Sequence, residues 1–323
     1  MKTRIAGTGH FLPKNVVTND DLSKIMDTSD EWISSRTGIR ERRLATEETT
    51  ASMSAEAAKL ALADAGVSAQ DIDLIIVATV SADHMTPSTA CEVQAAIGAD
   101  HAVAFDVNAA CSGFLFALQI ADMYIKQGVY KNALIIGAET LSKIMDWNDR
   151  STCVLFGDGA GAAVVCPAQD DNQGLASITL GSDGAKGMVL AGINRSNNNP
   201  YVKTDIGPHY IHMDGQEVYK FAVTTVPASI EKVLDEAGLT SEDIKYFVLH
   251  QANIRILQSV SKRLKVSMDK FPISLDHCGN MSAASVPVLL DEVNRKGMLE
   301  KGDKIVLAGF GGGLTWGACV VEW

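Results

Sequence analysis

The chain is best understood from residues 104–124, which read AFDVNAACSGFLFALQIADMY. An apolar run opens this stretch, small residues follow at 108–110, and apolar residues then recur at the spacing of a buried helix. The apolar residues of the helical part are Phe114, Leu115, Leu118 and Ile120. Cys111 therefore lies where a predicted strand ends and a helix begins. The N–H groups and dipole of a helix N-terminus favour a thiolate there, by about 0.3–2 kcal/mol.

Cys111 alone does not establish a catalytic thiol, because free cysteines are among the residues most often buried in protein cores. An ordinary cysteine has a pKa of about 8.5 and is only a few per cent ionised near neutral pH. A helix dipole lowers that pKa by at most about 1.5 units. The catalytic interpretation therefore depends on partner residues elsewhere in the chain.

The composition is that of an ordinary globular protein. The 323 residues are 46% hydrophobic and 21% charged, and a chain of this length can bury a large core as one domain or two. No apolar run is long enough to span a bilayer, and the start, MKTRIAGTGHFLP, lacks a signal-peptide core and cleavage site. We therefore expect a cytoplasmic location.

The cysteines indicate reduced thiols. They are Cys91, Cys111, Cys153, Cys166, Cys278 and Cys319. They form no C-x-x-C pair, so a disulfide framework is not expected. No Cys/His cluster has the spacing of zinc ligands, and the sequence therefore predicts no metal site.

The formal net charge of −11 argues against nonspecific nucleic-acid binding, but the charge is uneven. Residues 244–268 contain no acidic residue. The basic residues of this window are Lys245, Arg255, Lys262, Arg263 and Lys265, and a second basic group is Arg36, Arg40, Arg42 and Arg43. Each group is either solvated surface or a docking site for an anionic partner.

Two segments repeat each other at a constant offset of 172 residues. ADAGVSAQDIDLIIVAT at 63–79 aligns with DEAGLTSEDIKYFVLHQ at 235–251, with identical Ala, Gly, Asp and Ile at four positions. A looser echo relates AFDVNAACSG at 104–113 to SLDHCGNMSA at 274–283, each leading to a helix and then a strand. The repetition predicts a duplicated α/β unit, with halves 1–168 and 169–323 and mostly parallel sheets.

Local patterns predict further elements. Strands are expected at Arg4–Thr8, Leu74–Val80, Ala133–Gly137, Lys304–Gly309 and Thr315–Val321, and helices at 52–65, stopped by Gly66, and at Val226–Ala237. Short helices are expected at Leu22–Met26, capped by Asn19 or Asp20, and at Trp32–Ser35, capped by Ser29 or Asp30. Residues 192–212 read as a loop, and the glycine-rich stretches 156–161 and 310–313 fit neither dinucleotide nor Walker spacing.

Three reactive residue types fall where predicted strands end. Cys111 belongs to the first half, and His250 and Asn280 belong to the second. Ligands of α/β folds gather beyond the carboxyl ends of the strands. A single histidine after a strand is usually structural, but the convergence of three such residues favours a shared site.

The flanks of these residues resemble a known family. DVNAACSGF at 106–114, HQAN at 250–253, GNMSAASVP at 279–287 and GFGGGLTWG at 309–317 resemble beta-ketoacyl-[acyl-carrier-protein] synthase III. The similarity runs nearly end to end, through DEWISSRTGI at 30–39 and DRSTCVLFGDGAG at 149–161. It implies an α/β, thiolase-like five-layer αβαβα fold of two duplicated halves, and a homodimer. A Cys–His–Asn set distinguishes the initiating synthases from elongating ones, which have a second histidine where this chain has Asn280.

The resemblance also implies a reaction. A short acyl-CoA such as acetyl-CoA acylates Cys111, and malonyl-ACP then loses carbon dioxide and attacks the acyl-enzyme to give a 3-ketoacyl-ACP. His250 and Asn280 donate hydrogen bonds to the malonyl thioester oxygen, and the backbone N–H groups of Cys111 and Gly312 form the oxyanion hole. Phe310 closes the site against water. Acyl-CoA is a substrate, so no cofactor is expected.

The resemblance assigns binding residues as well. The CoA tunnel would be lined by Thr28, Trp32, Arg36, Arg150, Gly215, Tyr219, Ala252 and Asn253, with Trp32 and Arg150 sandwiching the adenine. The acyl carrier protein would dock on Lys220, Arg255, Lys262 and Arg263. Thr86 would line the acyl pocket across the dimer interface, where some members have Phe, so a smaller residue could admit longer or branched primers.

Some features and rival functions stay open. Tyr219 replaces a more familiar Phe, Cys278 stands where Tyr or His is common, and Met281 replaces a usual Thr. The nearest rival is a polyketide-type condensing enzyme that uses malonyl-CoA. A degradative thiolase would need a second cysteine as acid, and Cys319 lacks that motif. A rival of another class is a non-catalytic protein that binds CoA or the carrier protein.

Overall fold

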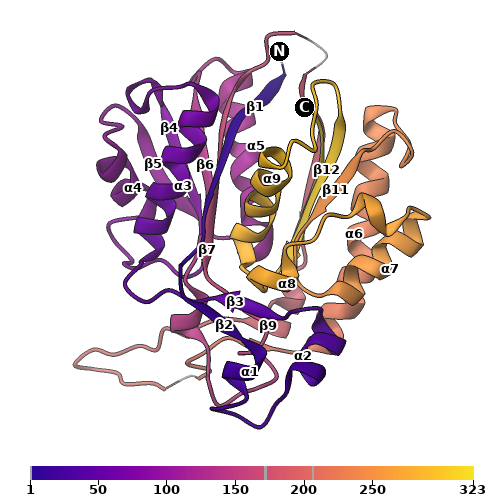
Figure 1. Cartoon of the computed structure of the whole chain (residues 1–323). Coiled ribbons are helices and arrows are strands. Elements are labelled where there is room, and N and C mark those ends of the chain that lie inside the picture. The colour runs from indigo at the N-terminus through magenta and orange to yellow at the C-terminus, as the bar shows by residue number, and fades with distance from the viewer. Residues whose placement is uncertain (1, 171–172, 206) are drawn as a thin grey trace.

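The computed structural model describes residues 2–170, 173–205 and 207–323 and shows two β-sheets with helices between and outside them (Figure 1). The first sheet has the order β1–β7–β6–β4–β5 and the second has the order β11–β12–β13–β8. The strands of the first are β1 (Thr3–Phe11), β4 (Leu74–Ala78), β5 (Val103–Val107), β6 (Ala133–Glu139) and β7 (Gly159–Pro167). Those of the second are β8 (Gly174–Ser182), β11 (Tyr246–Leu249), β12 (Lys304–Gly311) and β13 (Thr315–Glu322).

The two sheets repeat one pairing scheme. In the first, β4 pairs in parallel with β5 and β6, while β7 is antiparallel to β6 and β1. In the second, β11 is parallel to β12, while β13 is antiparallel to β12 and β8. No counterpart of β5 is present among the described residues of the second sheet. All strands of the first sheet precede residue 168 and all those of the second follow residue 173.

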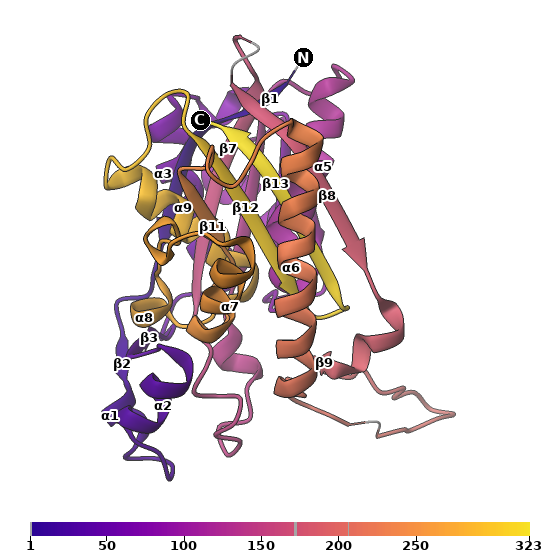
Figure 2. The same cartoon turned by 90° about the vertical axis from the view of Figure 1, so that its right-hand side faces the viewer.

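Two helices fill the space between the sheets. They are α5 (Gly113–Lys126) and α9 (Ser285–Arg295), and they share one buried apolar cluster with both sheets. The outer face of the first sheet is covered by α3 (Thr50–Ala65) and α4 (Thr89–Ile97). The outer face of the second is covered by α6 (Gly215–Ala237), which runs along its length in Figure 2, and by α7 (Ile254–Leu264). The result is the five-layer αβαβα arrangement that the sequence predicts.

Smaller elements gather at one end of the sheets, at the bottom of Figure 1. They are β2 (Val16–Thr18), α1 (Asn19–Leu22), α2 (Asp30–Thr37), β3 (Glu41–Arg43), β9 (Leu190–Ala191), β10 (His212–Met213) and, closer to α9, α8 (Leu275–Cys278). Within the described residues, no helix combines the length and apolar character needed to cross a membrane.

The local predictions mostly hold. Helix α3 begins with a capping box between Thr49 and Ser52 and ends at Gly66, whose φ of 64° is left-handed. Every residue of β4 is buried, as expected of a strand covered on both faces. The cap of α2 is Ser29, as predicted, but α1 begins earlier than predicted because the cap is Thr18, in a capping box with Asp21. Helix α6 extends further toward the N-terminus than predicted.

One predicted correspondence is wrong in register. The structure matches the turn Ala110–Ser112 before α5 with the turn Ser282–Ala284 before α9, so the offset is 172 residues, as in the first repeat, and not the 170 of the quoted echo. The SLDHC part of the echo forms helix α8, whereas AFDV belongs to strand β5. Asn280 therefore follows a helix and not the end of a predicted strand.

Candidate active site

Cys111 lies in a single turn of 3₁₀-helix, Ala110–Ser112, between β5 and α5. The turn starts from a left-handed residue, Ala110, with φ of 43°. The Cys111 side chain is buried, with 6% of its surface exposed. Strand β12 approaches so closely that a Cβ on Gly311 would lie 2.8 Å from Cys111 Cβ and 2.9 Å from its Sγ. The nucleophile is thus positioned by elements from both halves.

A cavity of about 820 Å³ opens in front of Cys111. Its walls come from the loop after β4, the loop after β5, the Gly312–Gly313 turn and residues 190–195. Ser282 and Phe156 also line it. The cavity is therefore large enough for a small acyl group and part of its carrier.

Asn280 is linked to Cys111 through Ser282. Asn280 Oδ1 accepts a hydrogen bond from the Ser282 backbone N–H at 2.9 Å, and the Ser282 hydroxyl lies within hydrogen-bonding reach of the Cys111 thiol. The backbone of Asn280 is held by Leu155 and Gly157, at 2.8 and 3.0 Å. Because Oδ1 is already engaged, the NH₂ group is the part of the carboxamide that can donate to a substrate.

His250 follows β11 directly and is 1% exposed. Its backbone N–H bonds to Ala308 O at 2.8 Å, and its ring meets Phe310 edge-on at 5.2 Å. Nδ1 is buried with no protein partner. Burial lowers the pKa of His250 to about 3, so the ring is neutral and can donate one hydrogen bond. Phe310, 2% exposed, covers it as predicted of a residue that excludes water.

The ionisation of Cys111 differs from the sequence expectation. Burial raises the pKa of the thiol to about 12, and the nearby carboxylate of Glu139 acts in the same direction. The Ser282 hydroxyl and a backbone hydrogen bond lower it only in part. The expected lowering by the helix dipole is therefore outweighed by desolvation, and the thiol is protonated in the substrate-free protein.

The glycine argument also shifts by one residue. The sequence places the oxyanion hole at Cys111 and Gly312 and expects Gly312 to tolerate no side chain. A Cβ on Gly312 would meet Leu190 O at 3.0 Å, whereas one on Gly311 would touch Cys111 Cβ, N and Sγ at 2.8–2.9 Å. Gly312 lines the cavity, so its place in the oxyanion hole stays a prediction.

The residues expected to bind adenine gather on α2. The guanidinium of Arg36 lies 4.7 Å and that of Arg150 lies 5.4 Å from the centre of the Trp32 ring. Arg150 also bonds to Asp27, with a side-chain contact of 3.0 Å. Since stacking on both faces of a base needs about 7 Å, Arg150 must swing away from Trp32 before an adenine can enter.

The other residues expected to bind CoA lie on neighbouring elements. Asn253 caps α7 and donates from Nδ2 to Arg36 O at 3.1 Å, while Ala252 precedes it after β11. Gly215 and the half-exposed Tyr219 lie on α6, where the Tyr219 hydroxyl meets Ser259 Oγ at 2.8 Å. Thr28 Oγ1, near the start of α2, is buried without a protein partner.

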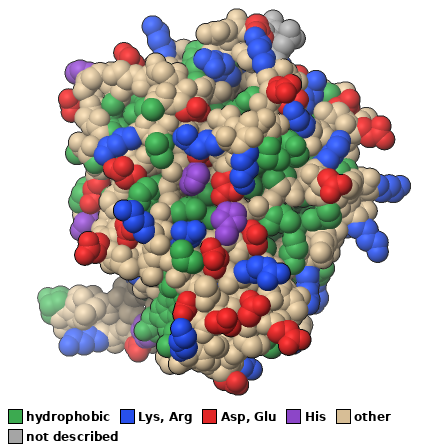
Figure 3. Space-filling model, in the orientation of Figure 1, with side chains coloured by type: hydrophobic (Ala, Val, Ile, Leu, Met, Phe, Trp, Pro, Cys, Tyr) green, Lys and Arg blue, Asp and Glu red, His purple; other side chains and the backbone are tan. Residues whose placement is uncertain are grey.

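The basic residues line one outer edge. Arg255, Lys262 and Arg263 are exposed on α7, and Lys220 is exposed on α6 beside it. Lys and Arg side chains project at the edge of Figure 3 where Figure 1 places α6 and α7. Arg255 bonds to Ser35 O at 3.0 Å, so this basic edge joins α2 and the residues around Trp32.

Thr86 is exposed and does not line the cavity in the single chain, although its neighbours His84 and Met85 do. Cys278 and Met281 are both fully buried beside Asn280, in a small cluster with Leu12 and Val288. Neither occupies the cavity in front of Cys111.

The sequence analysis missed three residues around Cys111. Ser282 connects Asn280 to the thiol, Gly311 makes room for it, and Glu139 is a fully buried carboxylate at the end of β6. Glu139 accepts hydrogen bonds from Thr79 Oγ1, Ser81 Oγ and the Val80 N–H. A charged residue ending an otherwise apolar strand was the available signal for Glu139.

Comparisons with known proteins agree with this geometry. The family model described as 3-oxoacyl-[acyl-carrier-protein (ACP)] synthase III matches residues 105–184, and the model of its C-terminal part matches residues 234–323. A beta-ketoacyl-[acyl-carrier-protein] synthase III of Clostridium acetobutylicum is 52% identical over 320 residues, covering 99% of this chain and 98% of the relative.

Solved structures extend the comparison. The 3-oxoacyl-[acyl-carrier-protein] synthase III of Aquifex aeolicus VF5 has a TM-score of 0.93 at 46% identity, covering 99% of this chain and 100% of that one. The priming beta-ketosynthase of the R1128 polyketide pathway has a TM-score of 0.91 at 36% identity, covering 99% and 96%. This chain belongs to the beta-ketoacyl-[acyl-carrier-protein] synthase III family of condensing acyltransferases.

Proposed function

We propose that the protein initiates fatty-acid synthesis by condensing acetyl-CoA, or another short acyl-CoA, with malonyl-ACP, giving a 3-ketoacyl-ACP, CoA and carbon dioxide. The observation that carries this proposal is the buried connection from Cys111 through Ser282 to Asn280, with the neutral His250 beside β12. This arrangement places a nucleophile and two neutral hydrogen-bond donors around one cavity. Family membership supports the same reaction class.

In the first half-reaction, Cys111 Sγ attacks the acyl-CoA carbonyl, and the C–S bond to CoA breaks. The thiol proton ends on the sulfur of CoA, so no external oxidant, reductant or metal is required. Acyl-CoA is a substrate, and we expect no cofactor. The backbone N–H groups of Cys111 and Gly312 would hold the oxyanion of the tetrahedral intermediate.

In the second half-reaction, malonyl-ACP loses carbon dioxide, and the resulting enolate attacks the acyl-enzyme. His250 and Asn280 Nδ2 donate to the thioester oxygen as its charge grows, and such donors are commonly worth about 2.7–4 kcal/mol each. A neutral imidazole suits this role because it donates without carrying its own charge into the site. The released Cys111 thiolate takes one proton to restore the resting thiol.

The binding surfaces follow from the same proposal. CoA enters between α2, α6 and α7, along Thr28, Trp32, Arg36, Arg150, Gly215, Tyr219, Ala252 and Asn253. The acidic carrier protein docks on Lys220, Arg255, Lys262 and Arg263, where charge complementarity steers association. We further infer a cytoplasmic homodimer with halves 1–168 and 169–323, in which Thr86 enters the acyl pocket across the interface.

A polyketide-type enzyme using malonyl-CoA is the second candidate, since a priming beta-ketosynthase of such a pathway has a closely similar fold. The exposed basic residues on α7 favour a carrier-protein substrate. Turnover with malonyl-CoA but none with malonyl-ACP would reverse the choice. Cys319, buried in the core between the sheets, does not line the cavity, so a thiolase mechanism has no second thiol there.

Separate half-reaction assays test the proposal. Mass spectrometry after mixing with acetyl-CoA should show one acyl adduct on the wild type and none on Cys111→Ser. His250→Ala and Asn280→Ala should still be acylated but should lose decarboxylation of malonyl-ACP. Absence of the adduct in the wild type would favour a binding protein, and equal loss of both half-reactions would contradict the assigned roles.

Primer range is tested separately. Acetyl-, isobutyryl- and hexanoyl-CoA should all acylate Cys111 if the small Thr86 widens the acyl pocket. Strict preference for acetyl-CoA would contradict that role of Thr86 while leaving the condensation itself intact.

A further inference from the structure

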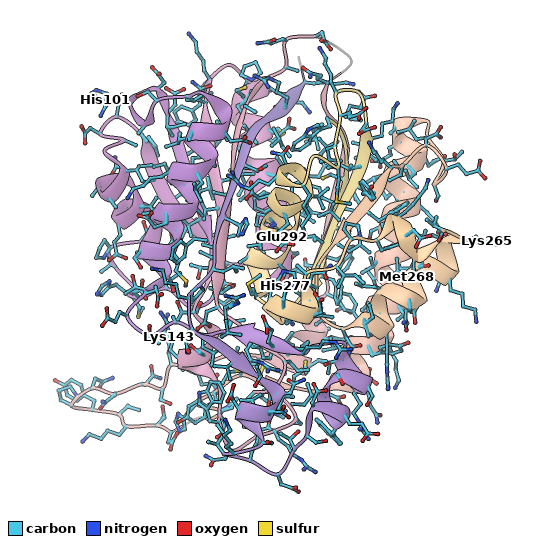
Figure 4. All side chains as sticks on the ribbon, in the orientation of Figure 1. His101, Lys143, Lys265, Met268, His277 and Glu292 are labelled. Carbon is cyan, nitrogen blue, oxygen red and sulfur yellow. The ribbon has the colours of Figure 1, made fainter. Side chains whose placement is uncertain are left out.

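A second group of reactive side chains lies outside the catalytic cavity, between α8 and α9. His277 and Cys278 come from α8 and Glu292 comes from α9. One ligand atom from each, a ring nitrogen, the thiol sulfur and a carboxylate oxygen, lies within 4.8 Å of the other two. Figure 4 labels His277 and Glu292 on the face turned to the viewer, and Figure 3 shows histidine among acidic and basic side chains on that face.

The contacts of His277 orient its ring toward the other two residues. Nε2 lies 2.8 Å from Glu292 Oε1, and Nδ1 lies 2.8 Å from Asp276 Oδ1. The hydrogen bonds to these carboxylates and to Cys278 raise the pKa of His277 to about 12, so both ring nitrogens carry protons in the metal-free protein. A carboxylate on the far nitrogen is the usual support of a metal-binding histidine.

The surroundings leave one side of the group open. Cys278 is fully buried and the Glu292 side chain is 9% exposed, whereas the His277 side chain is 34% exposed. Glu292 Oε2 pairs with Lys296 at 3.1 Å, which leaves Oε1 facing His277. An ion could therefore enter past the histidine and reach the thiol and the carboxylate.

We propose that His277 Nε2, Cys278 Sγ and Glu292 Oε1 form a binding site for a divalent cation of the zinc class. A thiolate with an imidazole selects zinc-like ions over magnesium or calcium, which prefer oxygen ligands. Three protein ligands leave a fourth, tetrahedral position for water on the exposed side. The ion replaces the Nε2 proton of His277 and the thiol proton of Cys278, and both protons pass to solvent.

The local charge suits such an ion. In the metal-free state, Asp276 and Glu292 are balanced by the imidazolium of His277 and by Lys296. With a dication bound, the Cys278 thiolate adds one negative charge and the His277 ring loses its positive charge, so the group stays neutral as a whole. Neither state leaves an uncompensated charge near the buried Cys278.

The site lies two residues before Asn280 in the chain but takes no part in the condensation. It would join α8 to α9 and so hold both ends of the segment that carries Asn280. The sequence argument against a metal site considered Cys/His clusters, and here the third ligand is a glutamate from the next helix. We expect bound metal to stabilise the fold rather than to supply reaction chemistry, so this inference is independent of the proposed function.

Cobalt(II) gives a direct test because its visible d–d bands report tetrahedral geometry and its thiolate charge-transfer band reports sulfur ligation. The protein is purified with chelator and reductant as Cys111→Ala, which removes the catalytic thiol. We expect one equivalent of Co²⁺ to give both signals, and Zn²⁺ to displace it. The signals should vanish in Cys111→Ala/Cys278→Ala and persist in Cys111→Ala/Cys166→Ala, a matched control on β7.

Asp276→Asn covers the case in which loss of Cys278 disturbs folding. Asp276 is exposed and touches only the far nitrogen of His277, so its change should weaken Co²⁺ binding about 10–100-fold without loss of the bands. Zn²⁺ should raise the thermal unfolding midpoint of the parent protein and not that of Glu292→Gln. Absence of the bands in the parent, or bands unchanged by both Cys278→Ala and Asp276→Asn, would overturn the site.

Discussion

The turn that carries Cys111 and the turn that follows Asn280 share one backbone geometry. Ala110 and Ser282, 172 residues apart, have φ values of 43° and 45°, and each begins a 3₁₀ turn that leads into a helix between the sheets. Each turn also packs against a glycine of the opposite half. A Cβ on Gly309 would meet Cys111 O at 3.0 Å, and one on Gly137 would meet Ala283 O at 2.1 Å.

The two turns differ in what faces them from the neighbouring strand. The Ser282–Ala284 turn faces Glu139 at the end of β6, whose carboxylate bonds to the Ala283 N–H and the Ser282 hydroxyl. At the matching position, 172 residues later, the Cys111 turn faces Gly311 at the end of β12. One half therefore fills the space in front of the turn with a carboxylate, while the other leaves it empty for a substrate oxygen.

This difference shows how a duplicated fold acquires one reactive site. Both halves build the same strained turn at a helix start, which aims backbone N–H groups at one point. In the second half, a protein carboxylate already occupies that point. In the first half, the absence of a side chain at Gly311 and the thiol at Cys111 convert the same scaffold into a site for acyl transfer.

The largest effect is expected from moving the thiol between the turns. Cys111→Ala should lower condensation by more than about 10⁴-fold, because no other group can form the acyl-enzyme. Decarboxylation of malonyl-ACP should remain measurable, since His250 and Asn280 are intact. Adding Ala283→Cys to this variant should give no acyl adduct by mass spectrometry, because Glu139 blocks that turn. An adduct at residue 283 would show that the turns are equivalent.

Filling the space in front of Cys111 should have the next largest effect. The methyl group of Gly311→Ala would lie 2.8–2.9 Å from Cys111 Cβ, N and Sγ, so the turn must shift. We expect acylation to slow about 100-fold, as for other small displacements of reacting groups. Gly184→Ala is the control, because a Cβ there meets nothing within 4 Å. Equal acylation rates in the two variants would contradict the role assigned to Gly311.

Glu139 should leave a pH signature on stability. Burial raises its pKa to about 7 from an ordinary value of 4.5, so the folded state binds its proton more tightly than the unfolded state. The unfolding free energy should therefore fall between about pH 4.5 and pH 7, by roughly 3 kcal/mol in total. Denaturant unfolding of Glu139→Gln should lack that decrease. A wild-type curve that rises with pH over this range would contradict the assignment.

The sequence predicted the architecture well because the duplicated pattern and the caps are local. The run from Leu74 and the stop at Gly66 follow from burial and backbone preference alone. The pairing of Cys111, His250 and Asn280 was accessible through strand ends and family motifs. The register of the second repeat was not, since SLDHC folds as helix α8 where its apparent counterpart forms β5.

The electrostatics could not be predicted in the same way. The helix-start position of Cys111 suggested a lowered pKa, but its burial depends on β12 and α9, which lie far away in sequence. The contacts of Glu139 with Ser282 and Ala283 likewise join the two halves. Such effects are set by three-dimensional packing, and no local pattern near Cys111 reports them.

The smallest expected effect concerns a second difference between the halves, in the first helix after β4 and β11. Helix α4 carries Glu92 and no basic residue, whereas α7 exposes Arg255, Lys262 and Arg263. Arg263→Glu should raise the KM for malonyl-ACP roughly 5- to 10-fold at low salt with kcat unchanged, because a charge at the rim of an interface governs association. The effect should shrink as salt screens the charges. Lys59→Glu on α3 makes the same charge change on the other half and should leave KM unaltered, so an equal response in both variants would mean that net charge, and not the α7 face, attracts the carrier protein.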